Sequence, residues 1–135
     1  MGLATDKHKT KKIINRAGLN VADGTLVHNG QIPRLKFPFI LKPNKQDNST
    51  GVVLIKSKHQ FKKMISVVKN IYIHVLAVEF IGGSDICVGV IWSNNEFYVP
   101  AMIEYLVSTD YPIRYTEDKL DLNNLGLPYQ QAKRT

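Results

Sequence analysis

The stretch of sequence that decides the fold lies between residues 37 and 55. It reads Phe37-Pro-Phe-Ile-Leu-Lys-Pro43, then Asn44-Lys-Gln-Asp-Asn-Ser-Thr-Gly51, and then Val52-Val-Leu-Ile55. Two apolar, β-prone segments flank a small polar one, and this pattern predicts two strands joined by a loop. The first strand carries Lys42 to its own end, beside the polar loop.

The polar loop holds groups that suit a polyphosphate ligand. Lys42 supplies a point charge, and Ser49 and Thr50 supply hydroxyl groups. Gly51 has no Cβ, so backbone N–H groups beside it can approach phosphate oxygens closely. A solvated turn of a β-hairpin explains the same residues without any ligand, and both interpretations stay open at this point.

Size and composition indicate one globular domain or a piece of one. The chain has 135 residues, of which 44% are hydrophobic and 21% charged. No apolar run approaches the length of a membrane span, and the amino terminus lacks the order of a secretory signal. The single cysteine, Cys87, excludes an internal disulfide. We expect it to be a buried small hydrophobe in a cytoplasmic protein.

The net charge of +7 raises the hypothesis of nucleic-acid binding. The lysines are scattered, however, and most fall on the polar faces of two predicted helices. No zinc spacing, aromatic RNA-binding motif or helix-turn-helix pattern accompanies them. Solvated helix faces therefore explain the charge better. The four histidines share no spacing, so we predict neither a metal site nor a catalytic base among them.

Periodicity predicts an α+β fold. Ser57-Lys-His-Gln60 has the form of a capping box and begins an amphipathic helix that we expect to end at Lys69. The other expected elements are a helix over 5–17 and strands over 25–28, 37–42, 71–81, 85–92 and 97–106, the last two joined by an Asn94-Asn95 turn. The middle β-β-α-β portion predicts a small sheet covered by one helix, followed by the start of a second antiparallel sheet.

The same pattern suggests four parts. Residues 1–35 form a helix and a connecting segment, and residues 36–82 form the small sheet with the phosphate-binding loop. Residues 83–120 begin the second sheet, and residues 121–135 are a polar tail without a convincing core.

Three further motifs lie before and after this loop in the sequence, and their order is informative. Asp6-Lys7 opens the first helix, Val78-Glu-Phe-Ile-Gly-Gly-Ser-Asp85 follows the long strand, and Glu117-Asp-Lys119 comes late. Together with Phe37–Pro43, these motifs resemble the ATP-grasp superfamily, most closely its D-alanine–D-alanine ligase-like carboxylate–amine ligases. The resemblance extends from about Leu3 to Leu120.

The resemblance implies a role for each matching position. Lys7 and Lys42 would approach the phosphates of ATP, and the loop over 46–51 would close over the triphosphate. The strand over 78–81 would bind the adenine edge through its backbone, and Asp85 would take the ribose hydroxyls, although a turn cap is an equal interpretation of Asp85. Lys119 would lie near the acceptor and is the candidate catalytic residue, with a solvated surface lysine as the other interpretation. The implied ATP-contacting set is therefore Lys7, Lys42, Asn48, Ser49, Thr50, Gly51, Glu79, Phe80, Ile81 and Asp85.

The sequence also departs from the family pattern. Asp47 and Asn48 stand where the family usually has glycine and serine, and Val78 stands where a glutamate often contacts the adenine amino group. Glu79 follows Val78, but alternation along a strand would place its side chain on the opposite face, so it is not expected to replace that glutamate. Glu104 is either a buried acid facing the acceptor or a charge on an edge strand. No metal ligands are assigned, because nothing after Lys119 matches the family's magnesium-binding segment.

The function that the resemblance implies is that of an ATP-binding fragment of a ligase. In the complete enzyme, ATP and Mg²⁺ would activate a carboxylate as an acyl phosphate, which an amine then attacks. The fragment alone is expected to do no chemistry, and a complementary ligase segment is an implied partner. The leading alternative is a non-catalytic module of the same fold that binds another protein.

Overall fold

The computed structural model describes residues 2–105, 113 and 132–134. The chain divides into two compact units, Met1–Ile81 and Gly82–Thr135, and each is described by itself. Both helices and antiparallel strands are present, which confirms the α+β prediction. Within the described residues, every helix is too short or too polar to cross a lipid bilayer.

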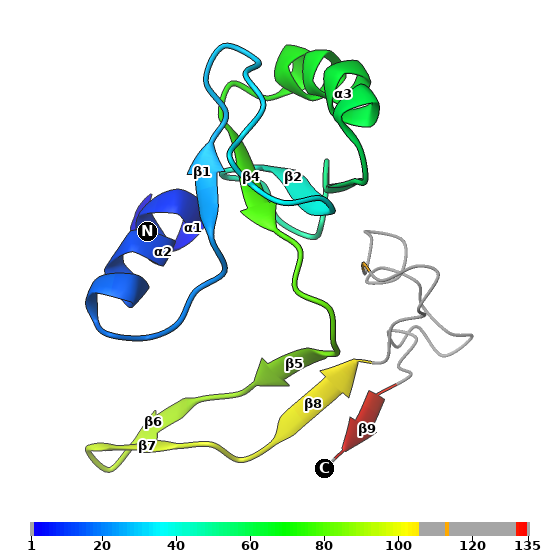
Figure 1. Ribbon diagram of the computed structural model, residues 1–135. Helices are drawn as coiled ribbons and strands as arrows, with labels where there is room; N and C mark the ends of the chain where they lie inside the picture. The colour runs from blue at the N-terminus through cyan, green and yellow to red at the C-terminus, as the bar shows by residue number, and fades with distance from the viewer. Residues whose placement is uncertain (1, 106–112, 114–131, 135) are drawn as a thin grey trace. The chain divides into compact units, whose positions relative to one another are not determined.

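The first unit is built on a four-stranded antiparallel sheet with the strand order β1-β4-β2-β3 (Figure 1). The central strands β2 and β4 pair over their whole length, from Phe39 opposite Glu79 to Pro43 opposite Val75. The elements of this unit, in chain order, are α1 (Gly2–Thr5), α2 (Lys7–Arg16), β1 (Gly24–Leu26), β2 (Phe39–Pro43), β3 (Val53–Ile55), α3 (Lys58–Ile71) and β4 (Val75–Glu79).

Helix α3 begins where the sequence predicts. The Ser57 hydroxyl oxygen accepts a hydrogen bond from the Gln60 N–H at 3.2 Å, which is the expected cap. The Gln60 side chain reaches one residue further back than a capping box requires, because its Oε1 accepts from the Lys56 N–H at 2.7 Å. The helix continues to Ile71, so the expected strand over 71–81 begins only at Val75.

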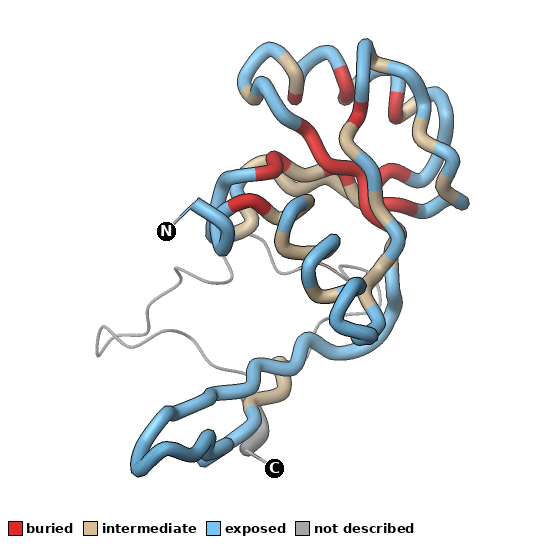
Figure 2. Tube along the Cα trace, turned by 90° about the vertical axis from the view of Figure 1, so that its left-hand side faces the viewer, coloured by how far each residue is buried: buried red, intermediate tan, exposed pale blue. Residues whose placement is uncertain are grey.

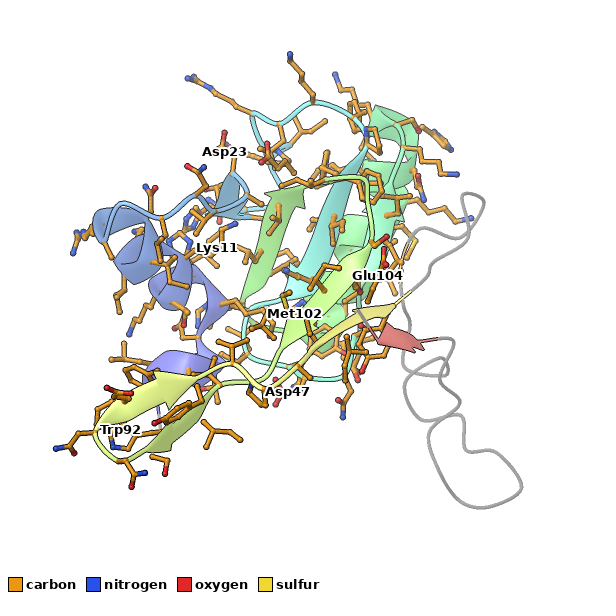
Figure 3. All side chains as sticks on the ribbon, turned by 90° about the horizontal axis from the view of Figure 1, so that it is seen from below. Lys11, Asp23, Asp47, Trp92, Met102 and Glu104 are labelled. Atoms are coloured by element: carbon orange, nitrogen blue, oxygen red, sulfur yellow. The ribbon has the colours of Figure 1, made fainter. Side chains whose placement is uncertain are left out.

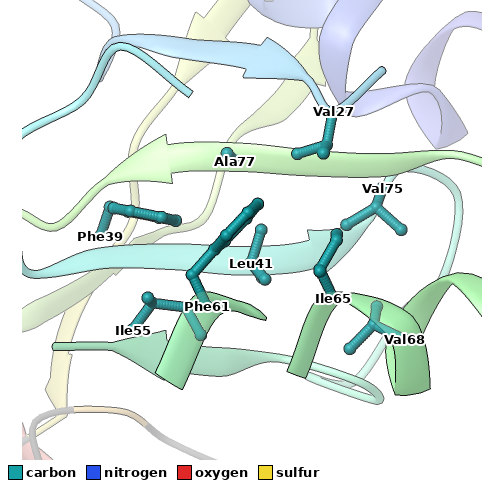
Figure 4. Packing of buried hydrophobic residues seen from close by; sticks show 9 residues of the cluster. All are labelled: Val27, Phe39, Leu41, Ile55, Phe61, Ile65, Val68, Val75 and Ala77. Carbon is teal, nitrogen blue, oxygen red and sulfur yellow. The ribbon is translucent and has the colours of Figure 1, made fainter. Parts of the chain in front are cut away.

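One face of the sheet packs against α3 and forms the core of the first unit (Figure 4). Alternation places Phe39 and Leu41 of β2 on this face, both fully buried. The rings of Phe39 and Phe61 lie 6.0 Å apart between centroids, which joins sheet and helix. The full cluster is Val27, Phe39, Leu41, Ile55, Phe61, Ile65, Val68, Val75 and Ala77.

Helix α2 lies against the other face of the sheet, beside β1. Val78 follows Ala77 in β4 and therefore points away from α3. A Cβ added to Gly24 would lie 3.2 Å from Cγ2 of Val78 and 3.5 Å from Nζ of Lys11, a residue of α2. The sheet thus has a helix against each face, and α2 adjoins the face opposite the core.

The second unit contains antiparallel strands. Strand β5 (Asp85–Val88) pairs with β8 (Met102–Tyr105), which also pairs with β9 (Ala132–Arg134), and β6 (Ile91–Ser93) pairs with β7 (Glu96–Tyr98). The expected strands 85–92 and 97–106 are each interrupted, at residues 89–90 and 99–101. The Asn94-Asn95 turn is confirmed, since both residues have positive φ, the requirement of a tight hairpin turn. Strand β9 falls within the segment expected to be a tail.

The prediction that Cys87 is buried is wrong. Cys87 lies in β5, where all four residues are exposed, and its thiol carries no disulfide. An alternating apolar pattern shows which side chains share a face but does not show that another element covers that face. Figure 2 shows this contrast between the red, buried strands of the first unit and the pale blue strands β5 to β7.

Candidate phosphate-binding site

Lys7 is the first residue of α2, and the residue before it, Asp6, caps the helix. Asp6 is the N-cap, and its Oδ1 accepts a hydrogen bond from the Lys9 N–H at 3.0 Å. The same oxygen accepts from the Asn44 side-chain amide at 2.9 Å. These two hydrogen bonds, that of Asn44 first, lower the pKa of Asp6 below its ordinary value of 3.8.

Asn44 links the start of α2 to the sheet by hydrogen bonds. It directly follows β2, and its backbone N–H donates to the carbonyl of His74 at 2.9 Å. Its side-chain Oδ1 accepts from the His8 N–H at 2.9 Å, and its backbone carbonyl accepts from the Lys7 N–H at 3.1 Å. Asn44 and Asp6 retain only 3% and 6% of their accessible surface, so this is a buried, satisfied polar link.

The ammonium group of Lys7 lies at the start of the polar loop. Its Nζ donates to the backbone carbonyl of Asn44 at 3.4 Å and also to the carbonyl of Gln46. A lysine from the first helix is thereby held against the loop that follows β2. The structure brings together two parts of the predicted site that lie far apart in the sequence.

Lys42 lies on the face of the sheet that α2 adjoins. It alternates with the core residue Leu41 and is half-buried, so it lies on the face opposite α3. That is the face beside which α2 lies. The two cations expected to approach phosphates therefore come from a helix and a strand on one face of the first unit.

The loop between β2 and β3 has a tightly turned backbone. The Thr50 N–H donates to the Asp47 carbonyl and the Val52 N–H to the Ser49 carbonyl, each at 3.1 Å. Asn48, Ser49 and Gly51 have φ values of +53°, +60° and +71°. Turns of this kind curve the backbone, and curved turns can form anion-binding concavities.

Gly51 has a packing role that the sequence did not indicate. A Cβ at this position would lie 2.7 Å from Cε2 of Tyr72 and 2.9 Å from Cγ of Pro43. The missing side chain thus lets the loop lie against the residue that follows α3. Whether the Gly51 N–H also faces a phosphate stays a prediction.

The end of β4 presents the segment expected to meet adenine. The Glu79 N–H donates to the Asp23 carbonyl at 2.9 Å, so this N–H is already engaged within the protein. Phe80 and Ile81 continue beyond the strand, half-buried and exposed respectively, and their backbone remains the candidate contact for a base edge. Val78 is 95% buried in the sheet, which agrees with its place on the opposite face from Glu79.

A third cation, Lys11, lies beside this strand end. Its Nζ donates to the Ala22 carbonyl, and its charge interacts favourably with Glu79 and Asp23. Burial is nevertheless the largest influence and lowers the pKa of Lys11 below its ordinary value. Figure 3 labels Lys11, which comes from α2, and Asp23, which directly precedes β1.

The remaining predicted residues lie elsewhere. Asp85 begins β5 in the second unit, opposite Tyr105, and is exposed. Glu104 is half-buried in β8, opposite Ile86, with strands on both sides, so it is not an edge-strand charge. Lys119 lies outside the described residues. Within the residues that the structure describes, no three acidic, histidine or cysteine side chains are grouped as metal ligands.

Sequence reasoning missed two residues that shape the site, Asn44 and Lys11. Asp6 before a helical pattern carries the usual N-cap signal, which was available from the sequence. Its partner Asn44 is 38 positions away, and no local pattern connects the two.

The α+β fold is that of the ATP-grasp class, and comparison with known proteins identifies the family. The chain matches the family described as "D-ala D-ala ligase C-terminus" over residues 12–132. This match covers most of the sequence, and the chain belongs to that family.

Curated relatives include D-alanine–D-alanine ligases. The chain is 30% identical over 101 residues to the ligase of Petrotoga mobilis, an alignment that covers 73% of this chain and 34% of the relative. It is 29% identical over 134 residues to the ligase of Haemophilus ducreyi, covering 87% and 41%. The chain therefore spans only a part of the length of these relatives.

Solved structures confirm the fold. The VanG D-Ala:D-Ser ligase from Enterococcus faecalis has a TM-score of 0.68 and 18% identity, over 98% of this chain and 38% of that one. The D-alanine–D-alanine ligase from Bacillus anthracis complexed with ATP has a TM-score of 0.64 and 22% identity, over 80% and 36%. At these identities the likeness concerns the fold alone.

Proposed function

We propose that this chain is the nucleotide-binding segment of an ATP-grasp ligase and that the first unit holds the triphosphate of ATP. The observation that carries the proposal is that the Lys7 ammonium group contacts the loop that follows β2, while Lys42 lies in β2 shortly before that loop. Two cations and a curved backbone offer charge and N–H donors, which a triphosphate requires.

The other roles follow from the fold. The backbone of Phe80 and Ile81, beyond the end of β4, is the candidate site for the adenine edge. Asn48, Ser49, Thr50 and Gly51 would line the triphosphate. Asp85 of the second unit is the candidate ribose ligand, and Lys119 remains the candidate catalytic residue. In this proposal Glu79 orders the strand end, because its N–H is held by Asp23.

The proposed reaction of the complete ligase is the formation of an amide bond. ATP would transfer its γ-phosphoryl group to a carboxylate and leave as ADP, and an amine substrate would then attack the acyl carbon of the resulting acyl phosphate and displace inorganic phosphate. The described residues do not provide a set of magnesium ligands, so no step through Mg²⁺ is derived for this chain. We expect the chain to bind ATP, and the cytoplasmic location expected from the sequence stays a prediction.

Titration with ATP, followed by NMR of the backbone amides, tests this proposal. We expect shifts clustered at Lys42, at residues 46–51 and at residues 78–81. Lys7→Met and Lys42→Met should each weaken binding by about tenfold or more, the scale of a lost charge-assisted contact. Lys63→Met is the matched control, because Lys63 is exposed on α3, against the opposite face of the sheet.

The alternative is a non-catalytic module that binds another protein. The observation that favours it is the exposed apolar surface of the second unit, where Trp92 and Phe97 are 58% and 73% exposed and their ring centroids lie 4.5 Å apart. Absence of amide shifts at millimolar ATP would overturn the nucleotide proposal and favour this module. Steeply salt-dependent binding to mixed-sequence DNA would favour the weaker hypothesis of nucleic-acid binding.

A further inference from the structure

The buried polar link between Asp6 and Asn44 has no part in the chemistry of ATP, yet it meets the proposed site directly. Each side chain makes two hydrogen bonds: Asp6 accepts from Lys9 and Asn44, and Asn44 donates to Asp6 and accepts from His8. A side-chain pair that is buried and hydrogen-bonded on both sides fixes the position of the elements that carry it.

The elements that it joins are the two that carry the phosphate-facing lysines. Asp6 immediately precedes Lys7, at the start of α2. Asn44 lies two residues after Lys42, at the end of β2, and its backbone is also fixed to His74 beside β4. The Lys7 N–H and Nζ both donate to the carbonyl of the same Asn44.

We propose that Asn44 is a positioning residue for ATP, which sets the Lys7 ammonium group against the polar loop through its buried link to Asp6. This inference rests on the proposed function. It adds that the affinity for the triphosphate depends on a side chain that does not itself touch the nucleotide. A lysine has a long, flexible stem, so fixing its backbone anchor and the carbonyls around its ammonium reduces the entropy lost on binding.

Binding of ATP and of adenosine to four forms of the full chain tests the inference. The forms are wild type, Asn44→Ala, Lys7→Met and the double variant. Asn44→Ala changes no charge, so it does not alter the electrostatic attraction to ATP directly. We expect Asn44→Ala to lower ATP affinity about ten- to a hundredfold, the range for a lost hydrogen bond to a charged group. Adenosine, which has no phosphate, should bind within about twofold of wild type.

The double variant separates positioning from general damage. If Asn44 acts through Lys7, adding Asn44→Ala to Lys7→Met should cause little further loss of ATP affinity. Asp6→Asn is the conservative control, because its side-chain oxygen can still accept from Lys9 and Asn44, and it should bind ATP nearly as wild type does. If Asn44→Ala does not fold, Asn44→Ser takes its place: its side chain is one atom shorter, so it loses the link to Asp6.

The outcomes distinguish this inference from the proposed function. If wild type does not bind ATP, the proposed function fails and the inference fails with it. If wild type binds ATP and Asn44→Ala binds it equally well, the inference alone is overturned. Equal losses for ATP and adenosine, or an undiminished loss in the Lys7→Met background, would show that Asn44 only stabilises the fold, which also overturns it.

Discussion

Replacing Gly51 with alanine tests how the polar loop is seated on the first unit. Two costs arise at this position. The φ of +71° is disfavoured for any residue with a Cβ, by about 1–2 kcal/mol. The new Cβ would also lie 2.7 Å from the Tyr72 ring and 2.9 Å from Pro43, so these side chains must move, at about 1–3 kcal/mol.

Gly30→Ala is the matched control. Gly30 has nearly the same φ, +68°, but nothing lies within 4 Å of the position of its Cβ. It should therefore show only the conformational cost of about 1–2 kcal/mol. The difference between the two variants isolates the packing against Tyr72 and Pro43, and we expect Gly51→Ala to be less stable by about a further 1–3 kcal/mol.

Urea unfolding and thermal unfolding of both variants measure this difference. In a domain of 60–100 residues, each kcal/mol lowers Tm by about 4–8 °C. Adding Tyr72→Ala should reduce the extra cost at Gly51 and leave the effect of Gly30→Ala unchanged, since the closest contact is with that ring. Equal destabilisation by Gly51→Ala and Gly30→Ala would refute the reasoning, because it would mean that the loop does not rest on Tyr72.

Three further predictions concern the framework of the same unit. Ile65→Ala should cost about 2–5 kcal/mol in urea unfolding, whereas Ile71→Ala should cost far less, because the two isoleucines of α3 are 6% and 66% exposed; similar costs would contradict the assigned core face. Ser57→Ala should cost about 1 kcal/mol by loss of the helix cap and Ser57→Thr much less, as circular dichroism during unfolding would show. The lowered pKa of Asp6 means that its stabilising contribution is present above 3.8 and lost as pH falls through the lower folded-state pKa. The free energy of unfolding should therefore fall less steeply at acid pH in Asp6→Asn than in wild type. An equally steep fall would refute the stabilising role of the Asp6 carboxylate.

Much of the first unit followed from local sequence. The spacing of Phe61, Ile65 and Val68 predicted the buried stripe of α3, and Ser57 marked its start. The apolar segment before Lys42 predicted β2 with alternate residues buried. These features depend on neighbours a few residues away, which is why a linear pattern reveals them. The end of α3 lies two residues beyond the expected Lys69, because Ile71 is β-branched and reads equally as the start of a strand.

Part of the candidate site could also be predicted. The order of motifs placed Lys7, Lys42 and the polar loop in one ATP-grasp family, and family membership is confirmed. The roles of the individual residues stay predictions. The hydrogen bond from the Glu79 N–H to the Asp23 carbonyl could not be predicted from the sequence. The partner of a strand residue depends on the order of strands in the sheet, and β1 pairs with β4, which lies far from it in the sequence.

The amino-acid order by itself determined most helices and strands of the first unit, the apolar face of α3, and the family to which the chain belongs. Only the tertiary structure decided that Asn44 fastens the start of α2 to the sheet, that Gly51 must be small because Tyr72 lies against it, and that Cys87 is exposed. Secondary structure follows from contacts between near neighbours in the chain. Burial and buried hydrogen bonds depend on which distant segments the folded backbone brings together.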